Sequence, residues 1–189
     1  MPALAPERLP RRNLTLYNST QQILENLRHQ LEAASDSELV RVALRYLEQL
    51  VIDQEEGRTL LIQSTDGASR TITYTALQAD VGEDREFVKR NIVVNQGSIE
   101  RMEDLKRALG VSSDSELVRR ALRYLNLIVD ETHKGSKFYL MEDGNQTLVR
   151  MDVLGKRSNR WKLGNIFKGG GVPAGGIKQP SFAGPRPSI

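Results

Sequence analysis

An internal repeat constrains the fold of this chain more than any other feature. The segment SDSELVRVALRYL (35–47) recurs as SDSELVRRALRYL (113–125), and twelve of the thirteen positions are identical at an offset of 78 residues. The same offset aligns RNLTLYN (12–18) with RNIVVNQ (90–96) without a gap. Two copies are too few for a solenoid, which needs about three repeats or more. We therefore expect two copies of one folding unit in this chain.

Each copy is predicted to begin with a strand and to end with a hairpin. Leu14 and Leu16 occupy alternate positions in copy one, as Ile92 and Val94 do in copy two. A period of two is typical of a strand with one buried face. Hairpins are expected at 57–74, turning at Asp66-Gly67, and at 135–153, turning at Asp143-Gly144.

Two helices are predicted between the strand and the hairpin of each copy. Apolar residues spaced three and four apart indicate the first helix, which Gly110 ends in copy two, where copy one has a glutamate. The second helix begins with the capping boxes Ser35-x-x-Glu38 and Ser113-x-x-Glu116, in which the serine accepts a backbone N–H and the glutamate reaches back. A wide apolar face follows each box and is expected to be core.

A lone strand in each copy would leave its backbone groups unpaired, and two short helices cannot cover the apolar residues. The two strands are therefore expected to pair antiparallel about a pseudo-twofold axis, with four helices beneath them around one core. The expected fold class is α+β, with two added β-hairpins. The expected organisation is a basic, proline-containing arm (1–11), copy one with its hairpin (12–74), a linker (75–89), copy two with its hairpin (90–154), and a disordered, basic tail rich in Gly and Pro (155–189).

The net charge of +3 conceals a segregation of charge along the chain. Residues 155–189 carry seven basic residues and no acidic one, and residues 1–12 carry +2. Subtracting both from +3 leaves −6 for residues 13–154. The sequence therefore predicts an acidic body with basic ends.

The composition excludes several classes of function. The chain has no cysteine, which excludes disulfides and thiolate metal sites and fits a reducing cytoplasm, and its two histidines have no second metal ligand at a useful spacing. No apolar run is long enough to span a membrane, and the first residues are not those of a secretory signal. Because no set of nucleophile, base and orienting residue is found, no catalytic residue, cofactor or metal is expected.

The two strands and the two SDSELVR helix starts resemble the ribbon-helix-helix family of Arc- and MetJ-type repressors. The resemblance covers roughly residues 12–50 of copy one and 90–128 of copy two. In that family two identical chains usually meet, whereas this chain would carry both halves as a tandem pseudo-dimer. The hairpins lie outside the basic family pattern.

The resemblance implies that the paired strands enter the major groove of DNA and read base edges with their outward side chains. Asparagine can bind an adenine edge, and threonine and valine can contact a thymine methyl group. The alternative is that these are ordinary solvent-facing strand residues. The candidate readers are Asn13, Thr15 and Tyr17 in copy one and Asn91, Val93 and Asn95 in copy two.

The resemblance also implies phosphate contacts at the start of each second helix, where the helix dipole favours an anion. Helix capping alone would explain the serines there, and Asp36 and Asp114 place a carboxylate where a phosphate would lie. Basic residues just before the strands could flank the groove. The candidate phosphate-binding residues are Arg11, Arg12, Ser35, Ser37, Lys89, Arg90, Ser113 and Ser115.

The basic tail is expected to contact a polyanion without sequence preference or, alternatively, to dock on a protein partner. Its cations are interleaved with two aromatic residues, Trp161 and Phe167. The residues proposed for the non-specific contact are Lys156, Arg157, Arg160, Trp161, Lys162 and Lys168.

The function expected from the sequence is a non-enzymatic, cytoplasmic and nucleoid-associated protein that binds double-stranded DNA. It would act as a transcriptional regulator or as an accessory factor in DNA partition or transfer, with pseudo-dimers associating along the duplex. The alternative is a protein-assembly module, in which the fold serves for dimerisation and the tail docks on a partner. Fold alone does not determine function. The acidic body favours that alternative, because DNA affinity comes largely from the neutralisation of phosphates.

Overall fold

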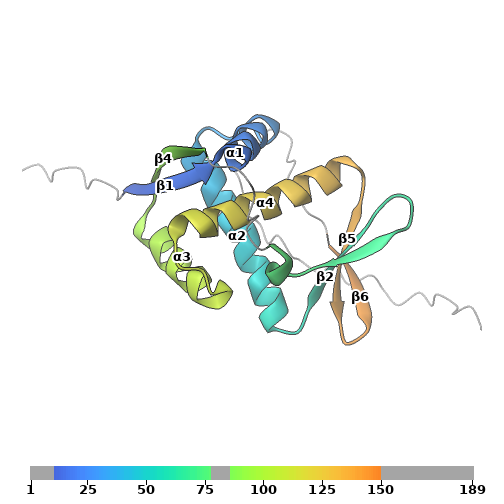
Figure 1. The fold of residues 1–189 in the computed structure, drawn as a ribbon. Helices are drawn as coiled ribbons and strands as arrows, with labels where there is room; N and C mark the ends of the chain where they lie inside the picture. Colours follow the sequence, from blue (N-terminus) through green and yellow to red (C-terminus); the bar gives the residue numbers. More distant parts are fainter. Residues whose placement is uncertain (1–10, 78–85, 150–189) are drawn as a thin grey trace, which may run out of the picture.

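A computed structural model describes residues 11–77 and 86–149 (Figure 1). The described chain is an α+β protein with four α-helices and two small antiparallel sheets, which confirms the expected class. The elements are β1 (Arg11–Tyr17), α1 (Asn18–Gln30), α2 (Asp36–Glu55), β2 (Thr59–Gln63), β3 (Ser69–Ile72), the short 3-10 helix η1 (Tyr74–Leu77), β4 (Phe87–Val93), α3 (Gln96–Leu109), α4 (Asp114–His133), β5 (Lys137–Glu142) and β6 (Asn145–Val149).

Strands β1 and β4 form a two-stranded antiparallel sheet, which we call the ribbon. Its register places Asn13 opposite Asn91, two residues separated by the repeat offset of 78. The inward side chains of Leu14, Leu16 and Ile92 are buried in the core. The predicted antiparallel pairing between the strands of the two copies is therefore confirmed.

Helices α2 and α4 supply half of the buried apolar residues of the core. Their predicted apolar faces are buried, and each helix runs from the ribbon toward a hairpin (Figure 1). Burying a leucine or valine side chain stabilises the fold by about 1.5–3 kcal/mol, so these two faces supply much of the driving force. The buried apolar residues of α2 are Leu39, Val40, Ala43, Leu44, Tyr46, Leu47, Leu50 and Val51, and those of α4 are Leu117, Val118, Ala121, Leu122, Tyr124, Leu125, Ile128 and Val129.

The two predicted hairpins join into one four-stranded sheet of order β3-β2-β5-β6. The joining pair is β2 with β5, and its register places Leu61 opposite Tyr139, again at the offset of 78. Leu60, Ile62 and Phe138 are buried on the inner face of this sheet. The sequence predicted the hairpins but not their union.

The boundaries of the second strand differ from the prediction. Strand β4 covers Phe87–Val93 instead of 90–96, because it pairs along the whole length of β1 and extends to Phe87 opposite Tyr17. The predicted linker 75–89 therefore includes most of η1 and the start of β4. Most of the predicted arm, residues 1–10, and the whole tail lie outside the described residues.

The ends of the first helices in the two copies use the same backbone conformation with different residues. Gly110 ends α3 with φ of 62°, as predicted. Its repeat equivalent after α1, Glu32, has φ of 49°. Glycine adopts this left-handed region without steric cost and other residues do so less readily, so copy one carries strain that copy two avoids.

Two buried carboxylates secure the junctions between the long helices and the hairpins. Asp53 in α2 and Glu131 in α4 are repeat equivalents and are 2% and 4% exposed. Asp53 accepts hydrogen bonds from Nε and Nη2 of Arg58. Glu131 accepts one from Ser136 Oγ at 2.7 Å and pairs with Lys134 and with Arg70 of β3. The hydrogen bond from Ser136, followed by that from Lys134, lowers the pKa of Glu131.

We expect Glu131→Gln to destabilise the fold at pH 7 by about 1.5–3 kcal/mol, since it weakens hydrogen bonds to a charged group. A carboxyl whose folded pKa is depressed stabilises the fold above its unfolded pKa of about 4.3, and that stability is lost as the pH falls through the folded value. Urea unfolding of both proteins at pH 7 and pH 3 should show a gap that narrows at low pH. An equal gap at both pH values would contradict this role.

Candidate nucleic-acid interface

The outward face of the ribbon is a ladder of four residue pairs. The register pairs Asn13 with Asn91 and Thr15 with Lys89, and Arg11 and Val93 form the pair at one end. Asn13, Asn91, Lys89 and Arg11 are exposed, and Thr15 and Val93 are partly exposed. The complete ladder is Arg11–Val93, Asn13–Asn91, Thr15–Lys89 and Tyr17–Phe87.

Five of the six predicted base readers therefore share one face of the ribbon, and Asn95 does not. Asn95 follows β4 and is the N-cap of α3, where its Oδ1 accepts the backbone N–H of Ser98 at 2.8 Å. Asparagine is among the preferred N-cap residues because its side chain satisfies an unpaired amide of the first helical turn. The prediction for Asn95 as a strand residue was wrong.

Serines from the second helices complete the hydrogen bonding at the outer edges of the ribbon. Ser115 Oγ of α4 accepts the backbone N–H of Thr15 at 2.9 Å, and Ser37 Oγ of α2 accepts that of Val93 at 2.9 Å. These two contacts are equivalent under the repeat offset. Each hydroxyl keeps a hydrogen of its own to donate. The structure thus shows a structural role for both serines, which the sequence had assigned to phosphate.

The N-caps of the second helices are as predicted. Ser35 accepts the backbone N–H of Glu38, and Ser113 accepts that of Glu116, both at 3.1 Å. The returning half of the capping box differs between the copies. Glu38 accepts the N–H of Ala34, one residue before the cap, whereas Glu116 pairs with Arg120 at 2.7 Å.

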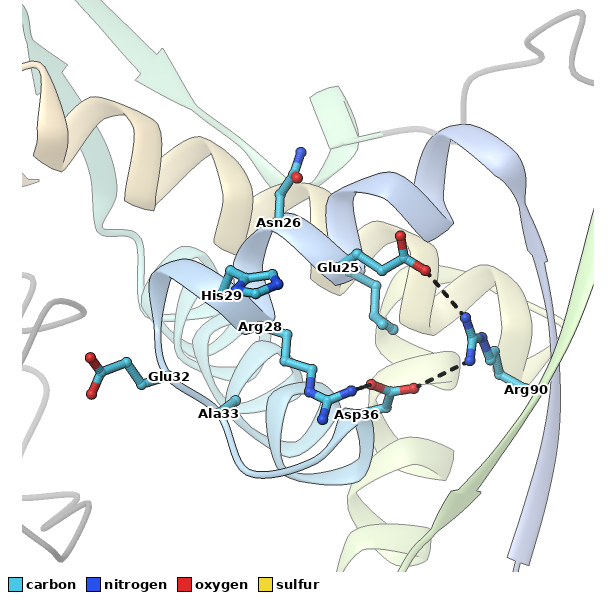
Figure 2. A pocket seen from close by; sticks show the side chains of 9 residues that line it. Glu25, Asn26, Arg28, His29, Glu32, Ala33, Asp36 and Arg90 are labelled. Atoms are coloured by element: carbon cyan, nitrogen blue, oxygen red, sulfur yellow. Dashed lines mark hydrogen bonds and ion pairs between the residues drawn. The ribbon is translucent and has the colours of Figure 1, made fainter.

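A cluster of four charged side chains lies at the start of α2. Asp36 pairs with Arg28 of α1 and with Arg90 of β4, and Arg90 also pairs with Glu25 (Figure 2). These residues line an open, polar hollow of about 900 Å³ that also includes His29. The carboxylates balance the two arginines, so the cluster is neutral overall.

The repeat-equivalent cluster lies at the start of α4. Asp114 pairs with Lys106 of α3 at 2.9 Å and with Arg12 of β1 at 3.7 Å, and Lys106 also contacts Glu103. The hydrogen bond from Lys106 to Asp114, followed by that to Glu103, raises the pKa of Lys106. Each second helix therefore begins beside two cations and two carboxylates.

These clusters separate the four predicted strand cations into two kinds. Arg12 and Arg90 lie on the inward side of the strand alternation and are held by Asp114 and Asp36. Lys89 lies on the outward face opposite Thr15, beside the predicted readers rather than at their flank. Alternation with Leu14 and Ile92 in the predicted strands could have placed Arg12 and Arg90 inward, whereas Lys89 lies before the predicted strand 90–96.

Two residues of the ribbon end escaped the sequence analysis. Phe87 is 57% exposed and stacks on Tyr17 with ring centroids 5.0 Å apart. Arg119 of α4 lies over the Tyr17 ring, with its guanidinium carbon 4.6 Å from the ring centroid. A strand prediction that began at Phe87 would have placed it on the outward face.

Comparison with known proteins finds no matching family model, no matching curated protein and no matching solved structure. Within residues 11–77 and 86–149, no group of three or more His, Cys, Asp or Glu side chains could hold a metal ion. No helix among the described residues is long and apolar enough to cross a membrane. The predicted tail contacts fall on residues 156–168, which the structure does not describe.

We expect Ser37→Ala and Ser115→Ala each to lower the free energy of unfolding by about 0.5–1.5 kcal/mol, because each removes the partner of a strand N–H. The two effects should add, since the serines serve separate edges of the ribbon. Ser69→Ala, at an exposed position in β3, is the matched control. Urea denaturation compares the unaltered chain with the two single variants, the double variant and the control, and a double variant as stable as the control would contradict the proposed edge contacts.

Proposed function

We propose that this chain is a tandem ribbon-helix-helix protein that binds double-stranded DNA by inserting the ribbon into the major groove. The two copies would act as the two halves of a pseudo-dimer, related by a pseudo-twofold axis through the Asn13–Asn91 pair. The biological role that best suits such an activity is transcriptional regulation, or assistance in DNA partition or transfer.

The observation that carries this proposal is the outward ladder of side chains on a ribbon whose outer backbone amides are already hydrogen-bonded. The major groove of B-DNA is about 12 Å wide and admits a two-stranded ribbon. The central asparagines are exposed and suited to adenine edges, and Lys89 next to them is suited to guanine or phosphate. Because Ser37 and Ser115 bind the outer backbone amides, the ribbon is held in place on the helices. The outward face of the ribbon is therefore already formed in the free protein.

The charge clusters fit a phosphate-binding role at the two ends of the ribbon. A helix N-terminus favours an anion, and in this structure Asp36 and Asp114 occupy that place in α2 and α4. A DNA phosphate could replace each aspartate as the partner of the neighbouring Arg90 or Arg12. The aspartates then compete with phosphate, so binding is expected to be weaker than the number of nearby cations alone would give.

Replacing Asn13 and Asn91 by alanine should relax sequence preference while leaving the fold intact, because both side chains are exposed. A bidentate asparagine contact discriminates between bases by about 1–3 kcal/mol. Selection of the full chain from a randomised duplex pool, followed by fluorescence anisotropy, measures the change. Asn145→Ala, on the exposed part of β6, is the control. An unchanged motif in the double variant would overturn the assignment of these readers.

Replacing Asp36 and Asp114 by asparagine should strengthen DNA binding, since it frees the paired cations and removes two carboxylates near the backbone. If two more phosphates are neutralised, the slope of log affinity against log salt concentration should steepen by about 2. The control Asp104→Asn with Asp143→Asn changes the net charge equally at two exposed positions. Equal effects of the two double variants would show that only net charge matters.

A second candidate function is protein assembly, and one feature of the hairpin sheet favours it. Leu61, Tyr139 and Leu148 lie in a row across the outer face of the sheet, and Leu148 is 52% exposed. If the full chain shows no duplex binding at near-physiological salt but self-associates in sedimentation velocity, assembly becomes the better reading. If the duplexes selected from the randomised pool converge on one motif, DNA binding is the better-supported function.

A further inference from the structure

The outward face of the described ribbon is not symmetric about the Asn13–Asn91 pair. On one side lies Arg11–Val93, with which the described residues begin, and on the other lie Thr15–Lys89 and then Tyr17–Phe87. Arg11–Val93 and Thr15–Lys89 are equivalent under the repeat, and each combines a cation with a β-branched residue, so the difference between the two directions rests on Tyr17–Phe87. The Tyr17–Phe87 pair, which we call the aromatic end, gives the ribbon a polarity.

Contacts from α4 and β4 hold the Tyr17 side chain of the aromatic end. Arg119 places its guanidinium over the Tyr17 ring and donates a hydrogen bond from Nη1 to the backbone oxygen of Thr15 at 3.0 Å. Phe87 stacks against Tyr17 with an interplanar angle of 37°. Beyond the aromatic pair, Asn18 Nδ2 donates to Glu86 at 2.7 Å and closes this end of the ribbon. A side chain held in this way loses little conformational entropy on binding.

The repeat equivalents of the aromatic pair are not aromatic. The equivalent of Tyr17 in copy two is Asn95, which leaves the strand and caps α3. The equivalent of Phe87 in copy one is Leu9, which lies outside the described residues. The two copies have diverged at the position that determines the chemistry of the ribbon end.

The chemistry of the aromatic end selects one group in the major groove. The four base pairs present hydrogen-bond donors and acceptors there, and the C5-methyl group of thymine is the apolar group. The exposed ring of Phe87 has no polar atom and suits that methyl group.

We propose that the aromatic end of the ribbon contacts thymine methyl groups and so fixes the direction in which the chain lies on a non-palindromic DNA site. This inference rests on the proposed DNA-binding function and adds to it a specificity-determining residue, Phe87, and a polarity. The ring contact between Phe87 and Tyr17 and the place of Phe87 on the outward face carry the proposal.

The test begins with the unaltered full chain and needs no variant. Sites selected from a randomised duplex pool should be non-palindromic, with thymine preferred at one end. Deoxyuridine, which lacks only the methyl group, is then substituted for thymine at each position in turn. We expect a loss of affinity of several-fold at the aromatic end, measured by fluorescence anisotropy. If the chain selects a motif but tolerates deoxyuridine throughout that end, the inference is overturned.

Phe87→Ala provides the second arm of the test. We expect it to bind the preferred site about tenfold more weakly, the equivalent of about 1.4 kcal/mol, and to bind thymine and deoxyuridine sites equally. The preference for the central bases should remain. Ile52→Ala, another exposed apolar residue but in α2, should leave both affinities unchanged. Persistence of the thymine preference in Phe87→Ala would also overturn the inference.

The outcomes for the inference and for the proposed function are separable. Failure of the unaltered chain to select any motif counts against the proposed function itself. Selection of a motif that is insensitive to Phe87 and to the thymine methyl group counts only against the role of the aromatic end. Circular dichroism of Phe87→Ala confirms that any loss of binding does not come from unfolding.

Discussion

Hydrogen bonds between β1 and β4 join backbone groups that lie seventy residues or more apart in the chain. Neither strand has another strand to pair with in the described structure, and an unpaired buried backbone group would cost about as much as a lost hydrogen bond. The ribbon in turn buries Leu14, Leu16 and Ile92 over the helices, and Ser37 and Ser115 bind its outer edges. The helices of each copy are thereby tied to the strand of the other.

Much of this arrangement was accessible from the sequence because the repeat is strong. The alternation around Leu14, the serine caps and the Asp-Gly turns act over a few residues, and each predicted element was found. The need of a lone strand in each copy for a partner also predicted which strands pair. Contacts between elements distant in sequence were harder to predict. The union of β2 with β5 depends on how α2 and α4 cross, and no local pattern reports that crossing.

The candidate interface was predicted less completely than the fold. Copying strand boundaries from one copy to the other placed Asn95 in a strand and left Phe87 in a linker, although the chain pairs from Phe87 onward. The ion pairs of Asp36 and Asp114 join residues from three elements each, so the charges were visible in the sequence but their partners were not. Physical neighbours at a site come from packing, which composition does not encode.

The covalent link between the two halves affects how well the ribbon stays paired at low protein concentration. In a homodimer the strand pairing is bimolecular and weakens as the protein is diluted, because folding is coupled to protomer concentration. Here β1 and β4 belong to one chain, and their effective concentration is set by the connection between them. The ribbon is therefore expected to stay paired even at very low protein concentration. The same link allows the two halves to differ in sequence, so that the equivalent residues Tyr17 and Asn95 serve different purposes.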